Sequence, residues 1–597
     1  MSGTAPAQAP VRRVPMGAAD VTIQRRADGA QLLKSPHPLE SHPRCLTERL
    51  AHWAGVAPDR DFVAKRNAGG TWDRLTYGAA HAQVLSIAQA LLARGLSADR
   101  PVAILSDSDL QHALIALACM HVGIAYVPVS SAYSLVSTDH AKLRYVMDLL
   151  TPGLIYAADE RFRKAIEAAV PVGTEVLYGR DFATLAATRP TEYVHASHAA
   201  VGPDTIAKFL LTSGSTGQPK AVINTQRMLC SNQQMILQGL PSLAKTPPVL
   251  VDWLPWNHTA GANHNFGLVL YNGGTIYIDD GRPVPGLIEK TVQNLREISP
   301  TIYFSVPRGY DALLPFLRED KALRDSFFRR LELLQYAAAV LPQPTWKAYE
   351  DLAAQACGER VQWITGYGAT ETTPAAMFTA SGARRSGTCG LPVDGLEMKL
   401  APVEGKFEAR FRGPSITPGY WRQPELTKAA FDDEGYYRTG DALRWIDESQ
   451  PSLGLEFDGR LTEDFKLGTG VWISVGPLRA RINAACAPLL HDAVITGHSR
   501  DDLGALLFLS PAGCKDLAPE EIRARLQSAL RKLARESTGS SNRITRALVL
   551  TEPPSIDAGE ITDKGSINQR AVLSRRAALV ERLYSPAPDA EILLAVE

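Results

Sequence analysis

The feature that most constrains the fold is an alternation of short apolar runs with longer amphipathic segments from about Cys45 to Ile446. Pro101–Leu105, Ile124–Val129 and Leu154–Ala157 have the length and apolar character of buried strands. Leu75–Arg94 has the apolar spacing of a helix. Strands that alternate with helices predict parallel-type sheets covered by helices, with ligands beyond the carboxyl ends of the strands. We therefore predict an α/β fold.

The chain is too long for one hydrophobic core. It has 597 residues, whereas single cores stop growing at roughly 250–300 residues. The pattern changes at the polar, turn-rich segment 447–454, and a long charged helix is predicted at 519–536. We predict a loosely ordered arm at 1–44, a large N-terminal domain at 45–458 and a smaller, mobile α+β C-terminal domain at 459–597.

Charge and cysteine content exclude several classes of protein. Lys plus Arg and Asp plus Glu are both 63, so the chain has no net field to attract nucleic acid or an anionic membrane. The seven cysteines include no C-x-x-C pair, so neither a zinc site nor a disulfide framework is indicated. The first residues do not have a secretory pattern, and no run approaches the roughly 18 apolar residues of a membrane span. We expect a cytoplasmic protein; a homodimer is left open.

A glycine- and hydroxyl-rich loop lies between two apolar runs, one ending at Leu211 and one at Ala221–Ile223. Its glycines let the backbone approach a bulky anion, its hydroxyls donate hydrogen bonds, and its lysine supplies a positive charge. A surface Ser/Gly loop is the alternative, and it would not explain the flanking strands. The P-loop of common NTPases is excluded because Pro219 precedes the lysine and a strand follows. The predicted polyphosphate site consists of Thr212, Ser213, Gly214, Ser215, Thr216, Gly217 and Lys220.

This loop and a second motif resemble a known family, the adenylate-forming enzymes, which include acyl-CoA synthetases, luciferases and peptide-synthetase adenylation domains. T-S-G-S-T-G-Q-P-K, ending at Lys220, matches the family's phosphate loop, and T-G-Y-G-A-T-E, ending at Glu371, resembles its Y-G-x-T-E. The resemblance implies that Tyr367 stacks near adenine, that Thr370 contacts the α-phosphate and the adenylate carbonyl, and that Glu371 holds Mg²⁺. An aromatic face, a hydroxyl and a hard carboxylate suit these roles. Alone, such a turn is typical of a helix start.

Two further motifs follow in the family's order. Y-R-T-G-D, ending at Asp441, resembles Y-x-T-G-D, in which the aspartate binds the ribose hydroxyls. F-D-G-R, ending at Arg460, has an arginine that in the family also contacts the ribose and marks the domain junction. The family's hinge position is occupied by Glu463, with Asp464 beside it.

The family's catalytic lysine near the C-terminus is expected at Lys564. Its usual form is P-K-T-x-S-G-K-x-x-R, and that lysine bridges the carboxylate and ATP during adenylation. Here Gly559–Arg570 reads G-E-I-T-D-K-G-S-I-N-Q-R, in which Lys564 is the one lysine. The resemblance assigns the role to it, and a surface lysine is the alternative.

Two segments resemble those that line the family's acyl pocket. They are D-W-L-P-W-N-H, which ends at His258, and L-Q-Y-A-A-A at 334–339. His258 is therefore a candidate for the catalytic site, and a core histidine with satisfied hydrogen bonds is the alternative. A metal bound by His258 and His264 is not expected, because no third ligand shares their spacing.

A narrower resemblance concerns the substrate. The segments 463–479 and 561–570 are similar to those of feruloyl-CoA synthetases, bacterial ligases that act on lignin-derived hydroxycinnamates. The resemblance implies an aromatic acid such as ferulate as the substrate and a role in aromatic acid catabolism. A medium- or long-chain fatty acid is the alternative.

The acceptor is expected to be coenzyme A. Gly468 and Gly470 lie where the family threads the pantetheine arm, and glycine permits that close passage. The short stretch after Lys564 leaves no room for a carrier-protein domain. A free thiol is therefore favoured over a tethered one.

Together the motifs predict an acid–thiol ligase that uses ATP, Mg²⁺ and coenzyme A. The acid attacks the α-phosphorus, pyrophosphate leaves, and the C-terminal domain then swings to admit the thiol. One alternative is a related enzyme that loads a carrier protein or oxidises its acyl group. Another is a nucleotide-binding relative without catalysis. The joint presence of Lys220, Thr370, Glu371, Asp441 and Arg460 favours an active enzyme.

Overall fold

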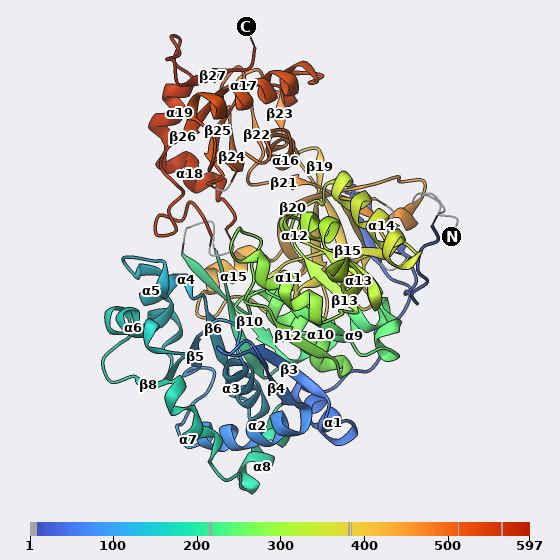
Figure 1. The fold of residues 1–597 in the computed structure, drawn as a ribbon, viewed down its shortest axis with the longest axis vertical. Coiled ribbons are helices and arrows are strands. Elements are labelled where there is room, and N and C mark those ends of the chain that lie inside the picture. Colours follow the sequence, from blue (N-terminus) through green and yellow to red (C-terminus); the bar gives the residue numbers. More distant parts are fainter. Residues whose placement is uncertain are drawn as a thin grey trace.

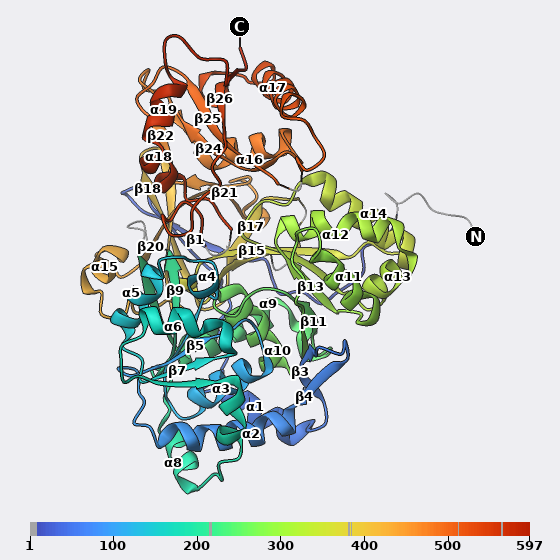
Figure 2. The same ribbon diagram turned by 60° about the vertical axis from the view of Figure 1, so that its left-hand side comes forward.

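The computed structural model shows a large body of sheets and helices with a smaller C-terminal unit at one end (Figure 1). A second view keeps this unit at the same end, above the body (Figure 2). The structure describes residues 9–213, 218–379, 382–383, 385–511, 513–562 and 565–596. The α/β class and the division into a large N-terminal and a small C-terminal part are confirmed.

The first sheet of the body confirms the predicted strand–helix alternation. It has six strands in the order β10-β9-β6-β5-β7-β8. All neighbours are parallel except β10, which is antiparallel to β9. The strands are β5 (Val102–Leu105), β6 (Tyr126–Val129), β7 (Leu154–Ala157), β8 (Glu175–Tyr178), β9 (Ile206–Ser213) and β10 (Pro219–Thr225).

Helices cover both faces of this sheet. Alternate residues of each strand point to opposite faces, and both sets are mainly apolar, so each face needs a covering layer. Val102 and Ile104 of β5 pack in the core that contains α2 and α3, whereas Ala103 and Leu105 pack in the core that contains α5 and α6. Asp109 caps α3 by accepting a hydrogen bond from the backbone N–H of the second helical residue. The helices around this sheet are α1 (Thr47–Val56), α2 (Tyr77–Leu92), α3 (Leu110–His121), α4 (Ala132–Leu135), α5 (Ala141–Leu150), α6 (Arg163–Ala169), α7 (Phe182–Ala186), α8 (Glu192–Ala200) and α9 (Gln226–Gly239).

The largest sheet is mixed and has eleven strands in the order β1-β2-β18-β19-β20-β21-β17-β16-β15-β14-β13. Its β13–β15 end is parallel and is covered by α11–α14, which lie together on one side of the body in both views (Figures 1 and 2). The remaining pairs are antiparallel. Its strands after the N-terminal hairpin are β13 (Ile302–Ser305), β14 (Leu333–Tyr336), β15 (Gln362–Gly368), β16 (Ala375–Phe378), β17 (Thr388–Pro392), β18 (Glu397–Val403), β19 (Lys406–Arg412), β20 (Tyr437–Trp445) and β21 (Leu455–Arg460).

A third sheet has four strands in the order β11-β12-β3-β4. Its strands are β3 (Asp61–Arg66), β4 (Trp72–Thr76), β11 (Val249–Asp252) and β12 (Thr275–Ile278). The further helices of the body are α10 (Gly267–Asn272), α11 (Ile288–Glu297), α12 (Pro307–Glu319), α13 (Lys321–Arg329), α14 (Gln343–Cys357) and α15 (Pro424–Ala430).

The N-terminal segment differs from the loose arm that we expected from its composition. Within it, β1 (Thr22–Arg25) and β2 (Gln31–Lys34) form a hairpin, and β2 pairs with β18. Leu33 of this hairpin is fully buried. The segment is ordered because β2 pairs with β18 at the edge of the large sheet. The residues of the segment alone do not indicate this pairing, since β18 is far away in the sequence.

The C-terminal unit has its own cores and mixes strands and helices, as an α+β unit does. A four-stranded sheet in the order β24-β25-β26-β27 follows a short β22-β23 pair. The predicted long charged helix is confirmed as α17. The elements are β22 (Phe465–Lys466), β23 (Trp472–Ile473), α16 (Val475–Ala485), β24 (Leu490–Thr496), β25 (Leu503–Leu509), α17 (Pro519–Arg535), β26 (Ile544–Leu550), α18 (Gln569–Arg575), α19 (Ala577–Leu583) and β27 (Ile592–Leu594).

Within the described ranges, no helix combines the length and the apolar character needed to cross a bilayer.

Candidate active site

One cluster of predicted site residues is centred on Asp441. The Tyr367 hydroxyl donates to its Oδ2 at 2.7 Å, and Arg460 Nε donates to its Oδ1 at 2.9 Å. Asp441 and Arg460 are cross-strand partners on β20 and β21, and Tyr367 comes from β15. Asp441 raises the pKa of Arg460, so the arginine remains charged. A carboxylate has about four lone-pair directions, so Asp441 can still accept from a pair of hydroxyls.

A second cluster joins Glu371 to Lys220 through Tyr420. The Tyr420 hydroxyl donates to Glu371 Oε1 at 3.0 Å. The Lys220 ammonium lies 4.8 Å from the centroid of the Tyr420 ring, which is a cation–π distance. Burial raises the pKa of Tyr420, and the Glu371 charge adds to this shift, so the phenol keeps its proton and remains a donor.

The two clusters are linked by Tyr437, a buried residue four positions before Asp441 on β20. Burial raises the pKa of Tyr437, and Glu371, Tyr420 and Tyr367 lie close enough to add to this shift. The structure therefore brings together the predicted residues Lys220, Glu371, Tyr367, Asp441 and Arg460.

Backbone pairing explains why these segments meet. Residues 417–421 lie along β10, where Ile223 N–H donates to Gly419 O at 3.1 Å and Trp421 N–H donates to Ala221 O at 2.9 Å. Thr417 N–H donates to Glu371 O at 2.9 Å. Tyr420 was missed in the sequence, because its role depends on this pairing and a Gly-Tyr pair alone has no specific signal.

A strand lies on either side of the predicted phosphate loop, as the flanking apolar runs predicted. Strands β9 and β10 pair antiparallel, with Lys220 opposite Thr212. Gly214, Ser215, Thr216, Gly217 and the side chain of Ser213 lie outside the described residues. Thr370 is buried at the start of the short 3₁₀ turn η6 (Thr370–Thr372), directly before Glu371.

Lys564, the predicted catalytic lysine, also lies outside the described residues. On either side of it, Ile561 and Ile567 form an isolated antiparallel bridge. Shortly before, Asp557 Oδ2 accepts from the Thr138 hydroxyl at 2.9 Å, and Lys142 of α5 donates to Ile556 O. Since α5 packs beside β10, the segment that leads to Lys564 is docked on the phosphate-loop side of the body.

The junction between the two parts of the chain is held by Lys406 of β19. Its ammonium donates to Asp458 O at 2.6 Å, to Asp464 Oδ2 at 2.8 Å and to Ser474 Oγ at 2.8 Å. Asp464 also accepts from the N–H of Val475 at the start of α16. Glu463, at the family's hinge position, is half-buried, and burial raises its pKa.

Gly468 and Gly470, predicted to face the acceptor, lie on the exposed turn between β22 and β23. Gly470 has φ +82° and open space where a Cβ would stand. Its left-handed backbone conformation favours glycine, although a Cβ at this position would meet no neighbouring atom.

The two segments of the predicted acid region begin at the end of β11 and within β14. His258 lies in a half-buried turn before the π-helix η5 (Ala260–Phe266), a type of helix that is frequent at functional sites. His264 is buried; its Nδ1 is 2.9 Å from Asn265 Oδ1 and its Nε2 is 3.1 Å from Gln335 Nε2. Burial lowers the pKa of His264 to about 4, so this imidazole is neutral at pH 7.

The residues present fit a magnesium ion bound mainly through substrate phosphates. Mg²⁺ usually keeps several waters and takes only one or two protein carboxylates. Within the described part of the chain, no group of three or more His, Cys, Asp or Glu is arranged to hold a metal. Glu371 supplies one buried, oriented carboxylate beside Lys220.

Comparison with known proteins identifies related chains. A model described as AMP-binding enzyme matches residues 50–421, and one described as AMP-binding enzyme C-terminal domain matches residues 466–588. A malonate–CoA ligase of Arabidopsis thaliana is 30% identical over 265 residues, which cover 41% of this chain and 41% of that protein. The chain thus spans well under two thirds of this relative. An anthranilate–CoA ligase of Pseudomonas aeruginosa is 27% identical over 474 residues, 76% of this chain and 84% of that protein.

Among solved structures, the A-PCP didomain of a carboxylic acid reductase from Segniliparus rugosus, in complex with AMP, has a TM-score of 0.71. Its sequence identity is 19%, and the match covers 92% of this chain and 83% of that chain. At this identity the likeness shows the fold alone.

Proposed function

The chain belongs to the AMP-binding enzyme family, and we propose that it is an AMP-forming acid–thiol ligase that joins a carboxylic acid to coenzyme A at the expense of ATP. The observation that best supports this proposal is the meeting of the Asp441 cluster with Glu371, Tyr420 and Lys220 around Tyr437. In this site Asp441 can accept from vicinal hydroxyls, Glu371 offers a carboxylate to a hard cation, and Lys220 offers an ammonium to phosphate oxygens.

In the first half-reaction, a carboxylate oxygen of the acid bonds to the α-phosphorus of ATP and pyrophosphate leaves. Lys220 and the loop Thr212–Gly217 hold the outer phosphates, and Thr370 faces the α-phosphate. Glu371 would hold Mg²⁺, which supplies charge neutralisation for the phosphates. Tyr367 stacks with adenine, while Asp441 and Arg460 hold the ribose. The protein mainly positions charges, as in other phosphoryl transfers.

In the second half-reaction, the thiol of coenzyme A attacks the acyl carbonyl and AMP leaves with the bridging oxygen. We propose that Lys564 serves the first step and that the C-terminal domain then turns about 458–464, so that Gly468 and Gly470 line the path of the thiol. The domain boundary at Asp458 is part of this proposal. The contacts of Lys406 with Asp464 and Ser474 must break during such a rotation.

For the acid we propose an aromatic substrate, a hydroxycinnamate such as ferulate. The resemblance of 463–479 and 561–570 to feruloyl-CoA synthetases supports it, and a relative named for anthranilate, also an aromatic acid, aligns over most of this chain. His258, with the neutral His264 and Gln335, would lie toward the acid. A medium- or long-chain fatty acid is the second candidate.

A panel of cinnamates, benzoates and fatty acids, assayed for pyrophosphate and AMP release with and without coenzyme A, tests the function and the acid together. We expect hydroxycinnamates to give the highest kcat/KM. Turnover with none of the acids would contradict the ligase assignment, whereas a preference for fatty acids would contradict only the substrate. Competition between coenzyme A and a carrier protein identifies the acceptor.

A further inference from the structure

Strand β20 has an irregularity directly at the ribose-binding segment. Its register with β19 shifts between the pairs Arg410–Arg438 and Glu408–Ala442, so that Ala409 faces the three residues Thr439–Asp441. Such a bulge takes backbone groups out of the ladder and re-aims the side chain beside it. Here that side chain is Asp441.

The bulge is held from β19. Gly440 has φ +72°, a left-handed conformation that favours glycine, and its N–H donates to a side chain rather than to a backbone carbonyl. Glu408 Oε1 accepts from this N–H at 3.1 Å, and the Glu408 side chain is buried. On either side of Gly440, the Thr439 hydroxyl donates to Ala409 O at 2.6 Å and accepts from Asp441 N–H at 3.1 Å. The carboxylate therefore satisfies an amide that the bulge leaves without a strand partner.

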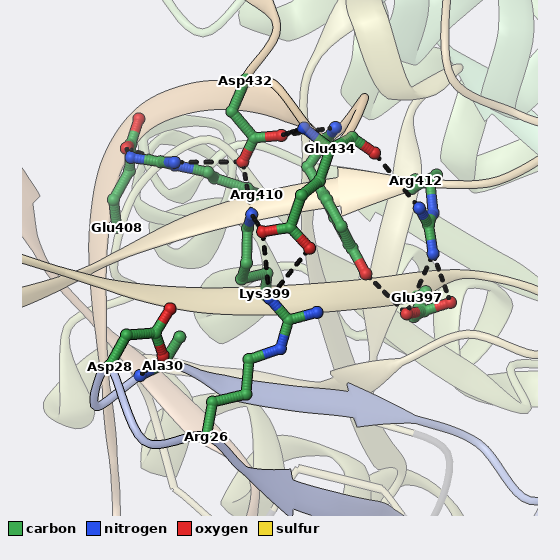
Figure 3. A network of polar contacts seen from close by, with 11 residues as sticks. Arg26, Asp28, Ala30, Glu397, Lys399, Glu408, Arg410, Arg412, Asp432 and Glu434 are labelled. Atoms are coloured by element: carbon green, nitrogen blue, oxygen red, sulfur yellow. Dashed lines mark hydrogen bonds and ion pairs between the residues drawn. The ribbon is translucent and has the colours of Figure 1, made fainter.

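Glu408 is itself fixed by a row of alternating charges (Figure 3). Its Oε2 accepts from Arg410 Nε at 2.7 Å, and Arg410 Nη1 donates to Asp432 Oδ2 at 3.0 Å. Asp432 pairs with Lys399 at 2.6 Å, and both side chains are almost completely buried. Burial acts to raise the pKa of Asp432, but hydrogen bonds from Lys399, the Tyr436 backbone and Arg410 outweigh it and lower the pKa to about 2.

The row continues to the N-terminal hairpin. Lys399 also pairs with Glu434 at 2.8 Å, and Glu434 pairs with Arg26 of the loop after β1 at 2.8 Å (Figure 3). A carboxylate with a fixed partner on one side presents its other oxygen to Gly440 in one position. Among the hydrogen bonds and ion pairs of the described residues, this network reaches the bulge at the Gly440 N–H and includes none to the side chains of Tyr367, Asp441 or Arg460.

We propose that Glu408 is a positioning residue of the ribose site, which fixes the bulge at Gly440 and so aims Asp441 at the ribose hydroxyls. The proposal rests on the assignment of Asp441 to the ribose in the proposed function. It adds a residue that touches neither ATP nor the acid, and whose role depends on the length of its side chain.

Two conservative variants separate the effect of the length of the Glu408 side chain from the effect of its charge. Glu408→Asp keeps the charge but withdraws the carboxylate by one methylene from Gly440. Glu408→Gln loses the charge and the oxygen that accepts from Arg410, but keeps one oxygen at the same distance from the backbone for Gly440. Glu397→Gln is the matched control, because Glu397 accepts from Tyr436 and Arg412 beside the same network and does not contact Gly440. For each protein, kcat/KM of acid-dependent pyrophosphate release is measured with ATP, 2′-deoxy-ATP and 3′-deoxy-ATP.

We expect Glu408→Asp to lose about tenfold of the preference for ATP over the deoxy analogues, the effect typical of one charge-assisted hydrogen bond, mainly through the KM for ATP. Glu397→Gln should keep the wild-type preference within about twofold. Glu408→Gln should lose less of it than Glu408→Asp, because its one amide oxygen still reaches Gly440 although its NH2 group no longer accepts from Arg410. An unchanged preference in Glu408→Asp, or an equal loss in Glu408→Asp and Glu408→Gln, would overturn the inference. A wild-type protein with no preference for ATP over the analogues would instead refute the ribose role of Asp441 in the proposed function.

Discussion

Replacement of Tyr420 by phenylalanine tests the link between the predicted metal carboxylate and the predicted phosphate lysine. The variant removes the hydroxyl that donates to Glu371 Oε1 at 3.0 Å and keeps the ring beneath the Lys220 ammonium. Tyr420→Leu removes both the hydroxyl and the ring. The two variants therefore separate the contribution of the hydrogen bond from that of the cation–π contact.

The structure sets the size of each effect. A hydrogen bond to a charged group contributes about 1.5–3 kcal/mol, which corresponds to roughly a 10- to 100-fold change in an equilibrium constant. The cation–π contact of a partly exposed lysine contributes about 0.5–1 kcal/mol, or roughly a two- to fivefold change. Without the hydroxyl, Glu371 loses a partner in a buried site, so its orientation toward the cation is less well defined.

The assay is acid-dependent pyrophosphate release, measured against free Mg²⁺ at fixed ATP and against ATP at saturating Mg²⁺. Tyr420→Phe should raise the half-saturating Mg²⁺ concentration by about tenfold or more and leave the KM for ATP nearly unchanged. Tyr420→Leu should in addition raise the KM for ATP by about two- to fivefold. Tyr436→Phe is the matched control, since that buried tyrosine donates to Glu397 instead. A wild-type Mg²⁺ dependence in Tyr420→Phe would refute the reasoning.

Three further predictions concern other parts of the chain. Lys564→Ala should abolish adenylation but leave thioester formation from a preformed adenylate largely intact; an equal loss of both half-reactions, measured separately, would show that the lysine does not act in the first step alone. Lys406→Met removes the contacts to Asp464 and Ser474, so adenylation should slow relative to thioester formation, and an unchanged ratio of the two rates would count against a rotation at this junction. Lys208 is buried, and burial lowers its pKa from 10.5 to about 7. Below about pH 7 the buried ammonium therefore lowers the free energy of unfolding by its full amount, and above pH 10.5 it no longer lowers it. Lys208→Met should be more stable than the wild type by about 3–5 kcal/mol near pH 6.5, with a difference that shrinks toward pH 10; denaturation curves that show the same difference at both pH values would contradict it.

The parts of the site that could be predicted are those encoded in short segments. The strands on either side of the phosphate loop could be predicted because two apolar runs flank a Gly- and Ser-rich segment. Asp441 and Arg460 could be assigned from motifs, and the structure places them opposite each other on neighbouring strands. In each case the chemistry and the local backbone are specified by adjacent residues.

Tyr420 and Glu408 could not be predicted, because their positions depend on pairing between distant segments. Tyr420 reaches Glu371 and Lys220 only because residues 417–421 lie along β10. Glu408 faces Gly440 only because the register of β19 and β20 shifts at that point. The N-terminal hairpin was missed for the same reason, since β2 is held by β18 rather than by its own sequence neighbours.

The central claim is that a carboxylate oxygen of the acid becomes bonded to the α-phosphorus of ATP. It is tested most directly by turnover of an acid labelled with ¹⁸O in both carboxylate oxygens, in the presence of coenzyme A, followed by mass spectrometry of the nucleotide and phosphate products. The account predicts one ¹⁸O in each AMP and none in pyrophosphate. Formation of ADP, or label in inorganic phosphate with unlabelled AMP, would contradict it.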